Sequence, residues 1–117
     1  MKKINILKNN RDFTRIIKGN KSFKYKDYII YIERDTNDLY KFGISVSKKI
    51  GNAVVRNKLK RQIKNIIDKK CYENSFNCII ILRKGILKKS YNEMSEELYS
   101  AFEILKLFKE ERSEKEW

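Results

Sequence analysis

The stretch from Lys48 to Lys70 constrains the fold of this chain more than any other. Near its start, Gly51 permits a sharp turn, and the side-chain oxygen of Asn52 can accept from the free N–H groups of a helix's first turn. Apolar residues then recur at helical spacing, and they are Val55, Leu59, Ile63, Ile66 and Ile67. The stretch therefore predicts an amphipathic helix that begins near Asn52, ends near Lys70 and packs one stripe against a core.

A second stripe of the same helix is basic. The stretch contains nine basic residues and a single acid, Asp68, so ion pairs along the helix cannot account for the charge. Cations in the N-terminal half of a helix also oppose its dipole. A charged stripe is ordinarily a solvated face, but these two features favour a face that binds a polyanion. The stripe consists of Arg56, Asn57, Lys60, Arg61 and Lys64.

Charge is distributed unevenly over the chain of 117 residues, whose net charge is +13. Residues 1–70 contain 20 basic and 6 acidic residues, a net of +14, whereas residues 71–117 contain 8 and 9, a net of −1. Hydrophobic residues make up 41%, which predicts one folded domain over 1–117, with a flexible basic arm at 1–8 and a frayed charged tail at 110–117. We expect a nucleic-acid partner, bound mainly by the N-terminal two thirds.

Several kinds of protein are disfavoured by composition. The chain has no His, its acids are scattered, and its four glycines form no phosphate loop, which argues against a self-sufficient enzyme. Two cysteines without His cannot complete a zinc site. The apolar run from Cys78 to Leu82 is too short for a bilayer, and no signal peptide follows Met1. We expect no zinc, no membrane partner and a cytoplasmic location with reduced thiols.

The remaining patterns predict an α+β fold. Apolar spacing indicates a first helix from Asn9 or Asn10 to Lys18, closed by Gly19, and a last helix from Ser90 with Glu93 in a capping box. Strands are expected at Ser22–Arg34, which can split in two, at Leu39–Ser47, antiparallel to it, and at Phe76–Arg83. The order α-β-β(-β)-α-β-α predicts a two-layer sandwich of one mostly antiparallel sheet and three helices.

At the basic turn and helix the sequence resembles a known family. Lys48-Lys-Ile-Gly-Asn-Ala-Val-Val-Arg-Asn-Lys-x-Lys-Arg61 is similar to the signature of the protein component of bacterial ribonuclease P. The strand beginning at Phe42 and the early Asp12-Phe13 pair fit as well, and the resemblance runs from Leu7 to Phe108. It implies a fold like the second domain of ribosomal protein S5, with a left-handed βαβ crossover.

The resemblance also implies a function, the removal of the 5′ leader from precursor tRNA. In this family the RNA subunit cleaves, with Mg²⁺ bound to RNA and substrate, and the protein, which binds no cofactor itself, pairs 1:1 with that RNA and contacts the precursor tRNA. The implied catalytic-RNA contacts are Lys48, Lys49, Asn52, Arg56, Asn57, Lys58 and Arg61. The implied leader contacts are Phe13, Ile17, Tyr31, Lys60 and Lys64.

Two positions depart from the family pattern. Lys58 stands where an Arg is usual, and Ile17 stands where a second aromatic is frequent, so bidentate contact at 58 and stacking at 17 are not expected. From the residues alone, Phe13 also reads as a core side chain and Tyr31 as a half-buried strand residue. The alternative function is a general or ribosomal RNA-binding protein. A DNA-binding helix-type regulator is disfavoured, because a strand precedes the basic helix.

Overall fold

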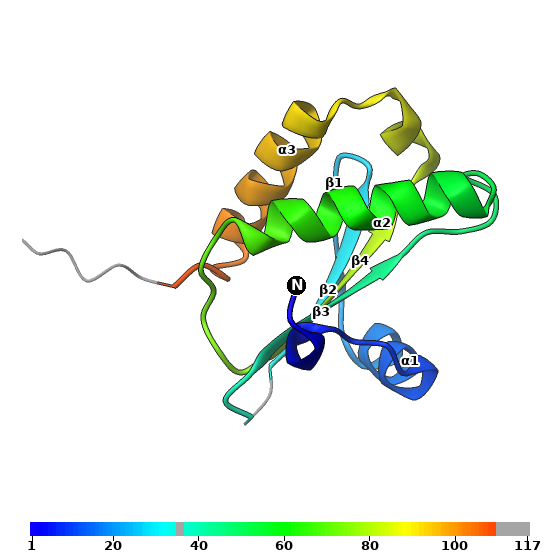
Figure 1. The fold of residues 1–117 in the computed structure, drawn as a ribbon. Coiled ribbons are helices and arrows are strands. Elements are labelled where there is room, and N and C mark those ends of the chain that lie inside the picture. Colours follow the sequence, from blue (N-terminus) through cyan, green and yellow to red (C-terminus); the bar gives the residue numbers. More distant parts are fainter. Residues whose placement is uncertain (35–36, 110–117) are drawn as a thin grey trace, which may run out of the picture.

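The computed structural model describes residues 1–34 and 37–109, and its elements follow the predicted order (Figure 1). The expected first strand divides at Lys26 and Asp27 into a hairpin of two strands. The elements are η1 (Lys3–Asn5), α1 (Asn10–Gly19), β1 (Ser22–Tyr25), β2 (Tyr28–Arg34), β3 (Tyr40–Ser45), α2 (Ala53–Asp68), β4 (Phe76–Leu82), η2 (Lys84–Lys88) and α3 (Tyr91–Ile104). The expected tail at 110–117 lies outside the described residues.

The four strands form one mixed sheet in the order β1-β2-β4-β3. Strand β4 pairs antiparallel with β2 and parallel with β3, so β3 runs antiparallel to β2 as predicted, although β4 lies between the two strands. Of the three strand pairs only β3–β4 is parallel, so the sheet is mostly antiparallel as expected. The strand–helix–strand unit around α2 is therefore a parallel crossover. Its handedness and the likeness to the S5 domain stay predictions.

Helices cover both faces of the sheet. Alternate residues of the central strands, including Ile30 and Ile80, join the main core with α2 and α3. The residues between them, including Tyr31 and Ile79, form a smaller core with Ile16 of α1. The sheet together with α2 and α3 forms the predicted two-layer sandwich. Helix α1 packs on the opposite face of the sheet and adds a partial third layer there.

Residues 1–8 are packed along the sheet, so the prediction of a flexible arm is wrong. The Asn5 side-chain amide donates to the Tyr40 carbonyl at 2.7 Å, and the Leu7 N–H donates to the Phe42 carbonyl at 2.9 Å. Leu7 itself is buried beside α1. An edge strand presents unpaired backbone groups, and this segment satisfies those of β3 as far as Phe42.

Two predicted helix caps are confirmed and one is wrong. Asn52 caps α2, and Ser90 with Glu93 forms a complete capping box on α3. Gly19 does not end α1 in the left-handed conformation, because it is the last helical residue and no described glycine has positive φ. The cap is Asn20, whose side-chain amide donates to the Ile16 carbonyl at 2.9 Å. A side chain thus satisfies the free carbonyl that a left-handed glycine would otherwise satisfy.

Candidate nucleic-acid interface

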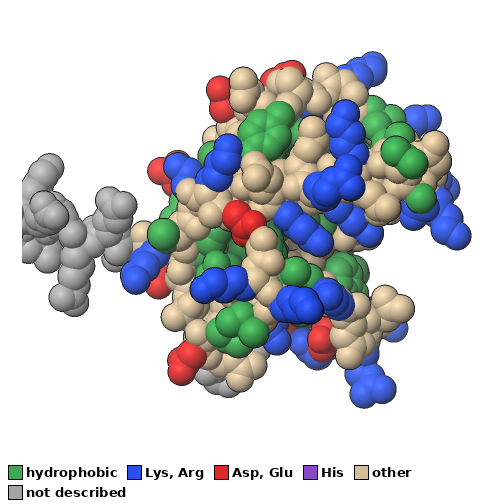
Figure 2. All heavy atoms as spheres, viewed as in Figure 1, with side chains coloured by type: hydrophobic (Ala, Val, Ile, Leu, Met, Phe, Trp, Pro, Cys, Tyr) green, Lys and Arg blue, Asp and Glu red, His purple; other side chains and the backbone are tan. Residues whose placement is uncertain are grey.

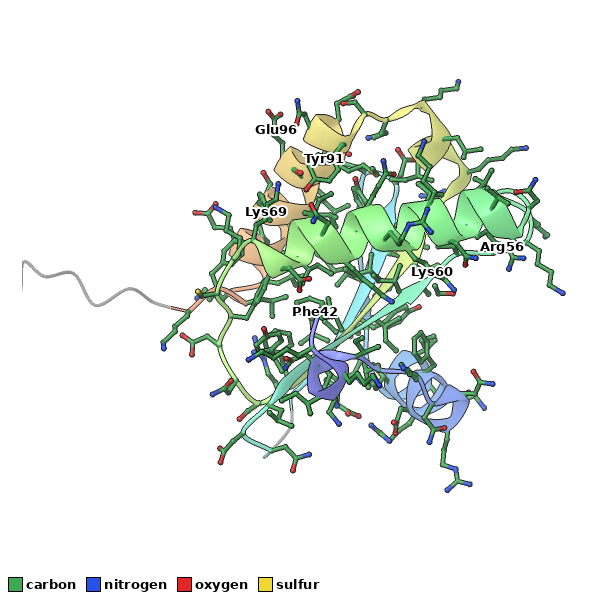
Figure 3. The ribbon with its side chains drawn as sticks, in the orientation of Figure 1. Phe42, Arg56, Lys60, Lys69, Tyr91 and Glu96 are labelled. Carbon is green, nitrogen blue, oxygen red and sulfur yellow. The ribbon has the colours of Figure 1, made fainter. Side chains whose placement is uncertain are left out.

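Helix α2 holds its cations outward because its other face is anchored in the core. Leu59 and Ile63 are buried, and the Asn52 side-chain oxygen accepts from the Val55 N–H at 3.0 Å to start the helix. Arg56 lies near that start and is half-buried (Figure 3). The other expected catalytic-RNA contacts are exposed, and they are Lys48, Lys49, Asn52, Asn57, Lys58 and Arg61.

These cations have no carboxylate partners in the described part of the chain. No ion pair there involves a Lys or Arg of α2 or of the turn before it. The single acid of the helix, Asp68, pairs with the Met1 amino group at 2.6 Å. The Arg56 Nε is buried and, within the described residues, makes no hydrogen bond. Lys and Arg side chains therefore gather along α2 with their charge uncompensated (Figure 2).

A cleft lies beside this cationic face. It is formed by α1, α2 and the C-terminal half of β3. Its volume is about 390 Å³. Lys60 and Lys64 of α2 line one side, and Phe13 of α1 lines the other, so residues far apart in sequence meet around one cavity. Lys60 lies on the edge of α2 that faces β3 and α1 (Figure 3). We call this cavity the α1–α2 cleft.

Phe13 reaches the cleft because residue 43 is a glycine. A Cβ built at Gly43 would lie 2.5 Å from the Phe13 Cζ, so any larger side chain would displace the ring. Of the other expected leader contacts, Ile17 and Tyr31 do not line the cleft. Both pack around the smaller core under α1 and are half-buried. The structure thus gathers Phe13, Lys60 and Lys64 and leaves Ile17 and Tyr31 to one side.

Several residues that line the cleft were not predicted from the sequence. Lys8 and Asn10 line the cleft, as does Ser45 at the end of β3. Lys8 fell in the segment expected to be a flexible arm. The signal that could have found it is the apolar pair Ile6 and Leu7 just before the first helix, which suggests a segment bound to the core.

Other kinds of site are not formed by the described residues. Within residues 1–34 and 37–109 no group of three or more His, Cys, Asp or Glu side chains is arranged to hold a metal ion. None of the helices in that part of the chain is long and apolar enough to cross a membrane. The fold and its surface define the class of this protein: a small α+β protein whose unpaired cations flank a cleft suited to a polyanionic chain.

Comparisons with known proteins show which family within this class the chain resembles. Residues 1–106 match the family described as Ribonuclease P. The ribonuclease P protein component of Mycoplasma mycoides is 42% identical over 109 residues, covering 91% of this chain and all of the relative. That of Streptococcus pneumoniae is 36% identical, covering 99% and 97%. The structure of the Staphylococcus aureus RNase P protein superposes with a TM-score of 0.80 at 32% identity, covering 90% and 98%.

The chain therefore belongs to the ribonuclease P protein family, whose members are accessory subunits of the enzyme that processes the 5′ end of tRNA. The resemblance read from the residues around Lys48–Arg61 is confirmed.

Proposed function

We propose that this chain binds both the catalytic RNA of ribonuclease P and the 5′ leader of precursor tRNA, in a 1:1 complex with that RNA. The α1–α2 cleft carries the proposal, because it joins an aromatic ring and two lysines beside the unpaired cations of α2. Such a pairing of stacking surface with positive charge suits a single-stranded nucleic acid.

The N-terminal half of α2 and the turn before it contact the catalytic RNA. Arg56 and Arg61 present guanidinium groups, which match phosphate oxygens in a bidentate fork, whereas Lys58 supplies a point charge. Asn52 and Asn57 are exposed amides that can pair with base edges or sugar hydroxyls. Lys48 and Lys49 extend the same surface at the turn.

The α1–α2 cleft receives the leader. Unpaired bases of a single strand can stack on the Phe13 ring, while Lys60 and Lys64 neutralise the adjoining phosphates. Tyr31 and Ile17 lie under α1 beside this path, where Ile17 can offer only apolar contact. The protein therefore contributes binding and orientation of the substrate.

The RNA subunit supplies the cleavage chemistry with Mg²⁺ bound to RNA and substrate. The chain's own part is electrostatic: its cations reduce the repulsion between two polyanions, so that substrate and metal ions bind at lower Mg²⁺ concentration. We expect this complex to operate in the cytoplasm.

The test is cleavage of precursor tRNA at low Mg²⁺ by a bacterial ribonuclease P RNA, with and without this protein. We expect the protein to restore cleavage at the mature 5′ end and to be inactive without the RNA. The double variant Lys60→Gln/Lys64→Gln should weaken binding of substrates with a leader and leave leaderless substrates unaffected.

The charge-matched control is Lys69→Gln/Lys70→Gln, because both lysines are exposed beyond the end of α2 and do not line the cleft. It should behave like the wild type. Failure of the wild-type protein to stimulate cleavage with the RNA of its own source would make the general RNA-binding protein the better account.

A further inference from the structure

One end of the molecule is built from segments that are distant in sequence. Because β3 and β4 are parallel, their carboxyl ends, marked by the pair Ser45 and Ile81, lie together. Strand β2 begins at the same end, since Tyr28 pairs with Leu82. The β1–β2 turn therefore meets the segment after β4, and the Arg83 N–H donates to the Asp27 carbonyl at 2.8 Å.

Five exposed cations lie at this end, on three separate segments. We call them the basic end, and they are Lys26, Lys48, Lys49, Arg83 and Lys84. None of them forms an ion pair with a carboxylate of the described residues. The acid of the adjacent turn, Asp27, is already paired with Lys89 at 3.1 Å. Lys and Arg side chains project around the end where α2 begins (Figure 2).

The backbone that carries these cations is held rigidly. A Cβ at Gly85 would lie 2.2 Å from an Asp27 carboxylate oxygen, so the β1–β2 turn sits directly on η2. Lys89 joins Asp27 to Glu97 of α3. Cations on such a platform lose little backbone entropy when they bind a ligand, which favours a preformed binding surface.

The basic end differs from the α1–α2 cleft in having no free aromatic ring among the described residues. Tyr25 stacks on Phe23 at 6.0 Å, and both pack against the main core. The Lys26 ammonium lies 6.0 Å above the Tyr25 ring, which covers that ring further. A surface with cations but no stacking platform suits phosphates rather than unpaired bases.

We propose that Lys26, Arg83 and Lys84 continue the RNA-binding surface from Lys48 and Lys49 around this end, and that they bind the phosphate backbone of a double-helical RNA segment. A duplex hides its bases and presents phosphates on two strands, which matches cations spread over three segments. The assignment rests on the proposed function for its natural partner, the catalytic RNA. It gives the C-terminal third of the chain, which is nearly neutral overall, a share of the interface.

The test variant replaces the three cations together: Lys26→Asn, Arg83→Gln and Lys84→Gln. Asn is chosen at 26 because Lys26 has a φ of 54°, in the left-handed region that Asn tolerates. The matched control is Lys106→Asn, Lys69→Gln and Lys70→Gln. Lys106 also has positive φ, 59°, and all three control lysines are exposed at the opposite end of α2 and α3.

The affinity of each protein for ribonuclease P RNA is measured over a range of salt concentrations. The test variant should bind more weakly. The plot of log association constant against log salt concentration should also become less steep, by about 0.9 for each phosphate contact removed. The control should keep the wild-type slope, and both variants should still unfold in one cooperative transition, since each replaces only exposed side chains. The ratio of affinities for precursor tRNA with and without a leader should not change in the test variant.

A second measurement uses a fully paired RNA duplex alone, so that the two proposals can fail separately. If the wild type fails to stimulate cleavage by the catalytic RNA, the proposed function is wrong, yet weaker duplex binding by the test variant still supports the basic end. Wild-type affinity and slope in the test variant on both RNAs would overturn the inference. A loss of affinity for the catalytic RNA without any loss for the duplex would also overturn it.

Discussion

Single side chains decide the shape of the α1–α2 cleft. The Phe13 ring lies directly over Gly43 and occupies the space that a Cβ at that position would need. Leu7, from the N-terminal segment, approaches the same position. Arg56, near the start of α2 and outside the lining of the cleft, holds a buried Nε that no described group satisfies. A buried donor without a partner is costly in the free protein, so a bound RNA acceptor would be favoured there.

Gly43→Ala should therefore alter both folding and leader binding. The new Cβ would lie 2.5 Å from the Phe13 Cζ and 3.1 Å from the Leu7 Cβ, so the ring must move. We expect a loss of about 1–3 kcal/mol in unfolding free energy, measured by denaturant titration, together with weaker leader-dependent affinity. Gly19→Ala is the control, because nothing lies within 4 Å of that position. A Gly43→Ala protein with wild-type stability and leader dependence would contradict this account.

Arg56→Ala should weaken assembly with the catalytic RNA and lower the free energy of unfolding by no more than about 0.5 kcal/mol, because it removes a buried donor that has no described partner. The side chain makes no ion pair in the described structure, so little native stabilisation is lost. Arg56→Lys should recover only part of the affinity, because it keeps the charge and loses the bidentate fork. Thermal melting alongside RNA binding separates the two effects, and a large drop in melting temperature would make Arg56 a folding residue.

At the scale of an element, α2 combines two requirements in one helix. Its apolar stripe, with Leu59 and Ile63, anchors it over the sheet, and its cationic stripe forms no ion pair with an acid of residues 1–34 or 37–109. The cost of grouping cations near the helix N-terminus is offset by that burial and by the Asn52 cap.

Substitutions at Asn52 can separate the cap from the RNA contact. Asn52→Ala should cost about 1 kcal/mol, because the Val55 N–H loses the oxygen that it donates to at 3.0 Å. Asn52→Asp keeps the cap and suits the helix dipole, so stability should be retained, but its negative charge beside Arg56 should weaken RNA binding. Both quantities are measured on the same variants. Equal RNA affinity for Asp and Asn at this position would exclude a contact there.

At the scale of the whole molecule, the main core encloses buried groups that stay protonated in the folded chain. Burial raises the pKa of the Cys78 thiol above its ordinary value of 9.0. Burial likewise raises the pKa of Tyr28, whose hydroxyl donates to Glu97, and of Tyr72, whose hydroxyl donates to the Ile67 carbonyl. These groups lie in the main core, so their ionisation opposes the packing of the entire domain.

The protein should consequently lose stability at alkaline pH. The unfolded chain releases the Cys78 proton above pH 9.0 and the Tyr protons above pH 10.0, whereas the folded chain retains them, so stability falls as pH rises. The hydrogen bond to Glu97 raises the pKa of Lys89 above 10.5, and its contribution, complete below that value, is lost at still higher pH. Melting temperature should fall from about pH 9 upward, and Cys78→Ala should reduce the early part of that fall. A constant melting temperature up to pH 11 would contradict this.

Local sequence determined the helices, the N-caps of α2 and α3 and the sign of the surface charge. The spacing of Leu59, Ile63 and the cations is set within a few turns, and Asn52 and Ser90 bond to N–H groups three residues away. Such features depend on residues that the chain already holds close together, so the sequence alone reveals them.

Tertiary structure alone decided the strand order, the packing of residues 1–8 and the composition of the basic end. Apolar strands such as β2, β3 and β4 can pair in several orders with similar local energy, and only the complete core selects one. The insertion of β4 beside β3 brings Arg83 to the end that holds Lys48, and the pairing of Leu7 with Phe42 builds one wall of the cleft. These arrangements rest on contacts between residues far apart in sequence, and local patterns do not specify which residues become partners.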